Sequence, residues 1–108
     1  MPTISIDDFR SVELRVATIT AATPHPNADR LVVLTIDVGG ETRQLVAGIR
    51  AHYEPESLVG KQIVVVANLQ PATLRGVESQ GMLLAAQGGS TVVPLTLGRE
   101  VPPGSPVL

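Results

Sequence analysis

Apolar and polar residues alternate along several short stretches of this chain, in the pattern of β-strands. Residues 12–16 alternate with a period of two, and residues 31–38 do the same over a longer stretch. Residues 63–67 are continuously apolar, which predicts a strand covered on both faces, by the core on one side and by a helix or a partner chain on the other. The predicted strands are residues 12–16, 31–38, 42–47, 63–67 and 82–86, with an edge strand over residues 91–97 that contains Pro94.

The segments around these strands carry turn and helix signals. Gly39-Gly40 predicts a hairpin, and the irregular alternation over residues 17–19 indicates a bulge. Residues 55–59 are expected to form a short helix, because Pro55 suits a helix start and Gly60 suits the position after its end.

Short extensions are expected at both ends of the chain. A helix is predicted over residues 5–10, where the Ser5 side chain can cap the first turn and Asp8 follows three residues later. Phe9 is expected to fill one end of the core. Residues 98–108 are rich in proline and predict an extended tail.

The order of the elements is strand, strand, strand, helix, strand, strand, which is that of the OB barrel. The expected fold class is therefore all-β, a five-stranded OB-fold barrel with a short helix between strands 3 and 4 and short terminal extensions. The 108 residues suit one domain, residues 1–108, with its core over about residues 9–97. OB folds commonly bind ligands with the loops after strands 1 and 4, here residues 23–30 and 68–79.

Residues 74–84 bring apolar, charged, small and glycine residues together in one short segment. Gly76 and Gly81 permit tight turns and a close approach of another backbone. The segment therefore presents Arg75 and Glu78 on a loop beside a strand, as many binding sites do. Two interpretations are open: a binding site, or a hairpin turn whose polar side chains face water.

Composition limits the class of partner. The formal net charge is −2, which argues against a broad phosphate-binding surface but allows a local patch. Of the eight Lys and Arg residues only Lys61 is lysine, and arginine suits bidentate contacts to phosphate. Phe9 and Tyr53 are the only aromatic residues, too few for a surface that stacks single-stranded bases.

The sequence has no pattern typical of an enzyme. There is no cysteine, and the two histidines are His52 and His25, which lies between two prolines as a rigid part of its loop. No nucleophile–base combination, phosphate loop or metal-ligand spacing is present, so we expect no catalysis, no cofactor and no metal. No stretch suits a signal peptide or a membrane span, and a soluble cytoplasmic protein is expected.

Six motifs follow one another along the chain from about Asp8 onward. They are Val12-Glu13-Leu14-Arg15-Val16-Ala17, Pro24-His25-Pro26-Asn27-Ala28-Asp29-Arg30-Leu31, Val46-Ala47-Gly48-Ile49, Leu58-Val59-Gly60-Lys61, Ala67-Asn68-Leu69 and Leu74-Arg75-Gly76-Val77-Glu78-Ser79-Gln80-Gly81-Met82. Together they resemble the tRNA-binding domain found at the C-terminus of many bacterial methionyl-tRNA synthetases, in EMAP II-like cytokine precursors and in small free-standing proteins. The chain is most similar in kind to a free-standing, CsaA-like member.

The resemblance implies an OB fold that binds folded tRNA at the outer corner of the L, without sequence preference and without catalysis. It also implies a homodimer, with residues 98–108 at the interface. A binder of folded RNA relies on shape, phosphate and 2′-OH contacts, which agrees with the low aromatic content. The family's RNA-contacting positions correspond to Asn27, Arg30, Asn68, Arg75, Ser79 and Met82, supported by Glu78, Gly76 and Gly81.

By this resemblance Arg30 and Arg75 each hold a phosphate, and the other side chains contact sugar, base or backbone. A purely structural role is open to most of them as well. Those roles are an ion pair to Asp29 or Asp37 for Arg30, loop capping for Asn27, satisfaction of barrel-end backbone groups for Asn68, a turn hydrogen bond for Ser79, core filling for Met82, and bracing of Arg75 or of backbone N–H groups by Glu78.

The chain departs from the family at Thr73 and near Ser11, where many members carry lysine. With few cations at the site, the salt dependence of RNA binding is expected to be shallow.

Two other functions remain open. An apolar groove near Met82, Leu69 and Val77 could bind unfolded polypeptides, as an export-type chaperone does. Alternatively, the strand over residues 63–67 could dock a synthetase or another protein.

Overall fold

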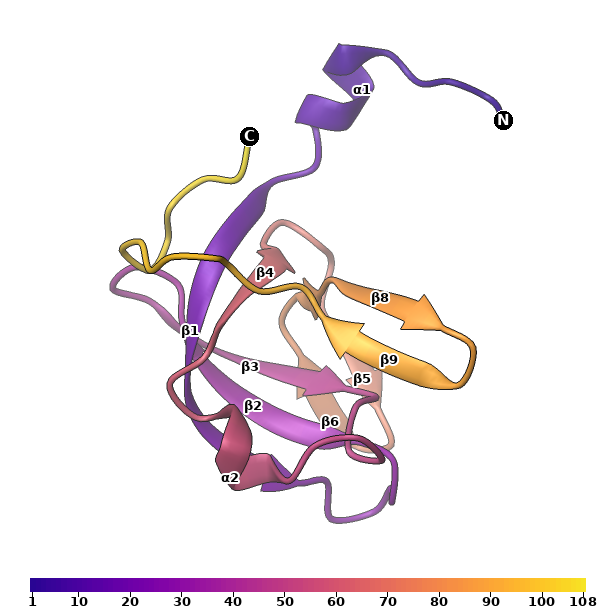
Figure 1. The fold of residues 1–108 in the computed structure, drawn as a ribbon, viewed down its shortest axis with the longest axis vertical. Coiled ribbons are helices and arrows are strands. Elements are labelled where there is room, and N and C mark those ends of the chain that lie inside the picture. Colours follow the sequence, from indigo (N-terminus) through magenta and orange to yellow (C-terminus); the bar gives the residue numbers. More distant parts are fainter.

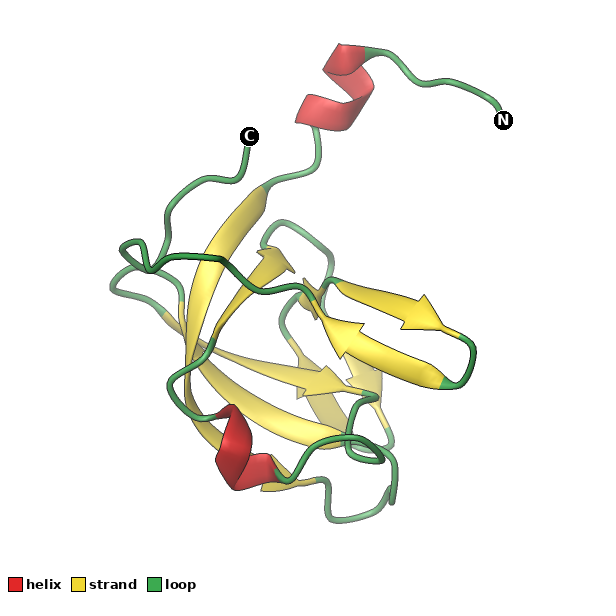
Figure 2. Cartoon of the chain, viewed as in Figure 1, coloured by secondary structure: helices red, strands yellow, loops and turns green.

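The computed structural model describes residues 1–108, and strands make up most of its regular structure (Figure 2). Five antiparallel strands form one curved sheet in the order β3-β2-β1-β4-β7 (Figure 1). Their bounds are β1 Leu14–Pro24, β2 Val32–Asp37, β3 Thr42–Ala47, β4 Gln62–Val66 and β7 Met82–Leu83. The other elements are α1 Ile6–Arg10, α2 Pro55–Leu58 and the strands β5 Ala72–Leu74, β6 Val77–Ser79, β8 Ala85–Gly88 and β9 Thr91–Pro94.

The sheet is closed into a barrel by contacts between β3 and the segment that leads into β7. The Val46 N–H donates to the Ser79 hydroxyl at 3.0 Å. The Gln80 N–H donates to the Gln44 carbonyl at 2.8 Å, and the Gln44 N–H donates in return to Gln80 Oε1 at 3.0 Å. With α2 between β3 and β4, this arrangement confirms the predicted OB fold.

Local signals predicted most of the elements correctly. The Ser5 hydroxyl accepts a hydrogen bond from the Asp8 N–H at 3.0 Å and caps α1. Pro55 begins α2, as expected. β1 extends to Pro24, eight residues beyond its predicted end, and its register against β2 shifts between Ile19 and Ala21, close to the expected bulge.

β4 is buried along its whole length, as its composition predicts. Ile63 and Val65 belong to the main core cluster. Gln62, at the start of the strand, is bonded to the chain's own C-terminal segment, since its Nε2 donates to the Val101 carbonyl at 2.7 Å and its carbonyl accepts from the Thr96 hydroxyl at 2.9 Å. At this end of the strand the chain's own tail takes the place of the expected helix or partner chain, and the burial of the whole strand leaves it no free surface to dock another protein.

The tail is extended, as predicted, and forms part of the barrel wall. It runs beside the first residues of β1, which precede the part of β1 that pairs with β2. The Gly104 N–H donates to the Val16 carbonyl at 2.7 Å, the Val16 N–H donates to the Ser105 carbonyl at 2.9 Å, and the Val107 N–H donates to the Leu14 carbonyl at 3.0 Å. These bonds satisfy backbone groups that would otherwise form an open edge.

Phe9 does not fill the core, and that prediction is wrong. α1 stands away from the barrel (Figure 1), none of its residues is buried, and Phe9 is 41% exposed. Of the two helices only α2 contributes to the core cluster, through its buried Leu58.

The predicted strand over residues 82–86 is in fact divided at Leu84. The Leu84 N–H donates to the Val64 carbonyl in β4, whereas the Leu84 carbonyl accepts from the Leu95 N–H beyond β9. The chain thus changes its pairing partner at this residue, and β8, which follows, is exposed and pairs with β9. β9 is an edge strand, as expected, but it ends at Pro94.

Neither α1 nor α2 has the length and apolar character that a membrane-crossing helix needs.

Replacing Gly81 with alanine is expected to destabilise the barrel. Gly81 has a φ of +132°, and an added Cβ would lie 2.9 Å from the Val66 carbonyl oxygen. Gly40 is a matched control, because its φ is +85° but an added Cβ would meet nothing within 4 Å. Gly81→Ala should lower the free energy of unfolding by about 1–2 kcal/mol more than Gly40→Ala does, measured by urea denaturation. Equal losses would show that backbone conformation alone requires glycine at residue 81.

Candidate nucleic-acid interface

Two loops predicted to carry the site are joined by hydrogen bonds. The first, residues 25–31, connects β1 to β2, and the second is the hairpin of β5 and β6. Arg75 Nη2 donates to the Asn27 carbonyl at 3.3 Å. The buried His25 ring contacts both loops, since its Nε2 lies 2.9 Å from the Leu74 carbonyl oxygen and its Nδ1 accepts from the Asn27 N–H at 2.9 Å.

Arg75 and Gly76 form the two-residue turn of the hairpin. Their φ angles are +53° and +89°, the combination that a tight type I′ hairpin turn requires. Gly76 adopts this conformation without cost, whereas Arg75 is the only residue other than glycine with positive φ in the chain. The segment is thus a hairpin turn, one of the two interpretations, and it places an exposed arginine at its tip.

Arg30 is exposed and forms no ion pair. The alternative partner Asp37 is occupied, because its Oδ1 accepts hydrogen bonds from the Gly39 and Gly40 N–H groups and caps the β2–β3 hairpin. The Arg30 carbonyl accepts from the Arg50 N–H at 3.3 Å, which brings a third arginine beside the loop. Arg50 was not predicted, since no local pattern links the segment after β3 to the loop after β1.

Two other arginines are partly exposed and are held by carboxylates and backbone carbonyls. Arg15 pairs with Glu13, and its Nη1 donates to the Gly104 carbonyl at 3.1 Å. Arg43 pairs with Glu41 at 3.1 Å and donates to the Ala67 carbonyl. Neighbouring carboxylates compensate the charges of Arg15 and Arg43. Arginines without such partners are therefore better candidates for contacts to an anion.

Asn68 lies at the end of β4, where both ends of its side-chain amide are used. Its Oδ1 accepts from the Glu13 N–H at 2.8 Å, and its Nδ2 donates to the Ser11 carbonyl at 2.8 Å. The structural role open to Asn68 is therefore present, in that it fixes the link between α1 and β1. A contact between Asn68 and RNA stays a prediction.

Two predicted roles need correction. Ser79 is only 4% exposed, and its hydroxyl donates to the Gly81 carbonyl at 2.9 Å, which is the turn hydrogen bond open to it as a structural role. The same hydroxyl accepts from the Val46 N–H, so it has no free proton to offer RNA. The Glu78 carboxylate forms no ion pair with Arg75, and the residue acts through its carbonyl, which accepts from Gln44 Nε2 at 2.8 Å. Both residues hold the hairpin to β3.

Two predicted side chains are free. The Asn27 side-chain amide makes no hydrogen bond within the chain, because only its backbone groups are used. Met82 is 48% exposed and so does not fill the core. The candidate interface therefore consists of the β1–β2 loop, the β5–β6 hairpin and the start of β7. Its available side chains are Asn27, Met82, Arg30, Arg50 and Arg75.

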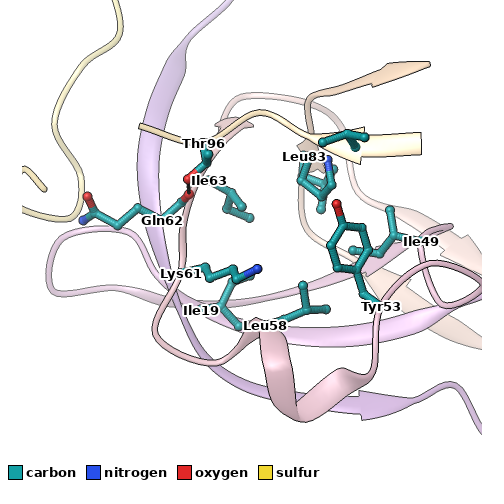
Figure 3. A pocket seen from close by; sticks show the side chains of 11 residues that line it. Ile19, Ile49, Tyr53, Leu58, Lys61, Gln62, Ile63, Leu83 and Thr96 are labelled. Atoms are coloured by element: carbon teal, nitrogen blue, oxygen red, sulfur yellow. Dashed lines mark hydrogen bonds between the residues drawn. The ribbon is translucent and has the colours of Figure 1, made fainter. Parts of the chain in front are cut away.

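An apolar cavity of about 250 Å³ lies elsewhere, between α2 and the β8–β9 hairpin. Figure 3 shows Lys61 pointing across it toward Tyr53, whose ring centroid is 5.5 Å from Lys61 Nζ. Core side chains such as Ile19 and Ile63 form part of its wall. No group of three or more His, Asp or Glu side chains is placed to hold a metal ion.

Comparison with known protein families identifies the family of this chain. The model of the tRNA binding domain matches residues 14–106. This chain belongs to the tRNA-binding domain family. The match covers the whole barrel and most of the tail, so the family resemblance of the sequence motifs is confirmed.

Relatives of this tRNA-binding domain include both large and small proteins. A methionine–tRNA ligase of Thermotoga maritima is 58% identical over 104 residues, which are 96% of this chain and 16% of the ligase. The crystal structure of a MetRS related protein from Pyrococcus horikoshii has a TM-score of 0.93 at 35% identity and covers 100% of both chains. The chaperone CsaA from Bacillus anthracis has a TM-score of 0.90 at 32% identity, covering 99% of this chain and 100% of its own.

Proposed function

We propose that this chain binds folded tRNA, without catalysis, through the β1–β2 loop and the β5–β6 hairpin. The observation that carries the proposal is that these two loops are hydrogen-bonded to each other while Arg30 and Arg75 remain exposed and free of carboxylate partners. Two exposed guanidinium groups on loops that are tied together suit two neighbouring phosphates.

The mode of recognition follows from the side chains available. Asn27 can contact a sugar or the backbone, and the Met82 thioether can pack on a sugar or base face. Aromatic stacking contributes little, because Phe9 lies on α1 and Tyr53 is partly buried at the cavity. Recognition by shape, phosphate and 2′-OH contacts favours a folded RNA feature such as the outer corner of tRNA.

We also propose that two copies associate through α1 and the tail. Ile6, Phe9 and Val12 are exposed on and next to α1, and they share a groove of about 410 Å³ with Pro106 and Val107 of the tail. An apolar face of this kind is costly to leave in water. A second copy would cover it with the same face, and the dimer would present two RNA-binding ends.

A second candidate function is binding of an unfolded polypeptide segment. The likeness to the chaperone CsaA and the apolar cavity favour it. The cavity is not the groove expected near Met82, Leu69 and Val77, since none of these residues lines it. An apolar side chain of such a segment would enter between α2 and the β8–β9 hairpin.

Removing one arginine charge should weaken tRNA binding and reduce its salt dependence together. Arg75→Gln is expected to lower the affinity for mixed tRNA about three- to tenfold at low salt and to reduce the slope of log K against log salt by about 0.9, the share of one phosphate contact. Arg99→Gln is the matched control, because Arg99 is exposed, is not part of the candidate interface and does not line the groove between α1 and the tail. Fluorescence anisotropy at several salt concentrations measures both quantities, with a simple RNA hairpin as the comparison ligand.

Equal effects of Arg75→Gln and Arg99→Gln would mean that binding is a diffuse charge effect, and the proposed interface would be wrong. Equal affinity for tRNA and for the simple hairpin would contradict recognition of the folded corner.

Introducing a charge into the α1 face should dissociate the dimer. Phe9→Asp is expected to give a monomer and to weaken tRNA binding, because the second RNA-binding end is lost. Val59→Asp is the control, since Val59 is similarly exposed but lies next to α2. Sedimentation velocity measures the mass of each variant. A parent protein that is monomeric at micromolar concentration would refute this part of the proposal.

Tyrosine fluorescence should report peptide binding, because Tyr53 is the only Tyr and the chain has no Trp. If the chain binds unfolded polypeptides in this cavity, an apolar unfolded peptide changes the tyrosine emission saturably. High salt does not weaken this binding. Val93→Phe, on the cavity wall, should abolish the change, and Leu95→Phe, which does not line the cavity, should preserve it. An unchanged emission with the parent protein would exclude peptide binding in this cavity.

A further inference from the structure

The hydrogen bonds of the His25 ring define its tautomer in this fold. A backbone N–H can only donate, so the His25 Nδ1 that faces the Asn27 N–H at 2.9 Å must be the bare nitrogen. The hydrogen of the neutral ring therefore resides on Nε2, which donates to the Leu74 carbonyl at 2.9 Å. One imidazole thus joins two loops, 49 residues apart in sequence, with one bond to each.

The environment of His25 leaves this ring little freedom. It is only 3% exposed, and its backbone N–H donates to the Leu31 carbonyl at 3.0 Å. Pro24 and Pro26 flank it, and a residue before proline is restricted to extended conformations. The side-chain direction is therefore set before any RNA arrives.

The His25 bond attaches the β5 side of the hairpin, which the bonds from β6 to β3 do not reach. A two-stranded hairpin is marginally stable alone, and every residue of β5 is exposed. The bond from His25 is the one hydrogen bond that joins β5 to a part of the chain other than β6. Without it, the Arg75 tip would be held from the β6 side and by its own 3.3 Å bond to Asn27.

We propose that His25 is a positioning residue of the RNA-binding surface. Its Nε2-protonated imidazole locks the loop that carries Asn27 and Arg30 to the hairpin that carries Arg75, so that both arginines reach RNA at a fixed spacing. This inference rests on the proposed tRNA binding and deepens it. The histidine touches no RNA itself and acts through Leu74 and Asn27, by removing the ordering cost that RNA would otherwise have to meet.

Two variants of His25 distinguish a role in joining the two loops from a role confined to the β1–β2 loop. In His25→Asn the Oδ1 can still accept from the Asn27 N–H, as in an Asx turn, but the side chain is too short to reach Leu74. In His25→Gln the longer amide can donate to the Leu74 carbonyl. His25→Asn therefore keeps the bond to Asn27 within the loop, whereas His25→Gln keeps the bond to Leu74 of the hairpin.

The first measurement needs no RNA. Amide hydrogen exchange of β5 and β6, followed by NMR, should be faster in His25→Asn than in the parent and should return toward the parent rate in His25→Gln. The ¹⁵N shifts of the parent ring should show a bare Nδ1 and a protonated Nε2. Parent-like exchange in His25→Asn, or hydrogen on Nδ1, would overturn the inference whether or not the protein binds tRNA.

The second measurement is tRNA affinity against salt, at a temperature where every variant is folded. His25→Asn should bind about three- to tenfold more weakly, as loss of one hydrogen bond allows, with its salt slope unchanged because no phosphate contact is removed. Arg75→Gln in contrast changes the slope. If His25→Asn has parent affinity, the cross-loop lock does not serve RNA binding, and if the parent itself fails to bind tRNA, the proposed function fails separately.

Discussion

The barrel depends on a backbone contact that only glycine permits, where Gly81 passes the Val66 carbonyl at the end of β4. This close approach lets the chain pair β7 with β4 and, one step earlier, lets Ser79 and Gln80 bond to β3. The segment from Ser79 to Leu83 thus bonds to β4 on one side and to β3 on the other, which closes the sheet. The β5–β6 hairpin leaves the barrel at this point, so the closure holds its β6 side, and the His25 bond to Leu74 holds its β5 side.

The net charge of −2 hides an uneven distribution of arginines. Arg15 and Arg43 are paired with Glu13 and Glu41 on the strands, and they brace the tail and the end of β4 through backbone carbonyls. The arginines near the β1–β2 loop and the hairpin lack such partners. An acidic protein can therefore keep a local anion-binding end, because attraction to phosphate depends on nearby unpaired charges more than on the total.

Strands and turns were largely predictable because their signals are local. Pro55 and Gly60 bound α2, and the Gly39-Gly40 pair marks its hairpin, without reference to the rest of the chain. The roles of Ser79 and His25 were not predictable in this way. Ser79 satisfies a buried N–H 33 residues away and His25 a carbonyl 49 residues away, and a polar residue in a turn has the same local pattern whether it faces water or such a partner.

The number of available arginines limits how RNA binding can depend on salt. Three phosphate contacts from Arg30, Arg50 and Arg75 give a slope of about −2.7, so a fourfold rise in salt weakens binding about 40-fold. If both copies of a dimer engage one RNA, six contacts double the slope to about −5.4, and the same rise weakens binding by about three orders of magnitude. The salt slope therefore distinguishes one bound copy from two, because the two expected slopes differ by a factor of two.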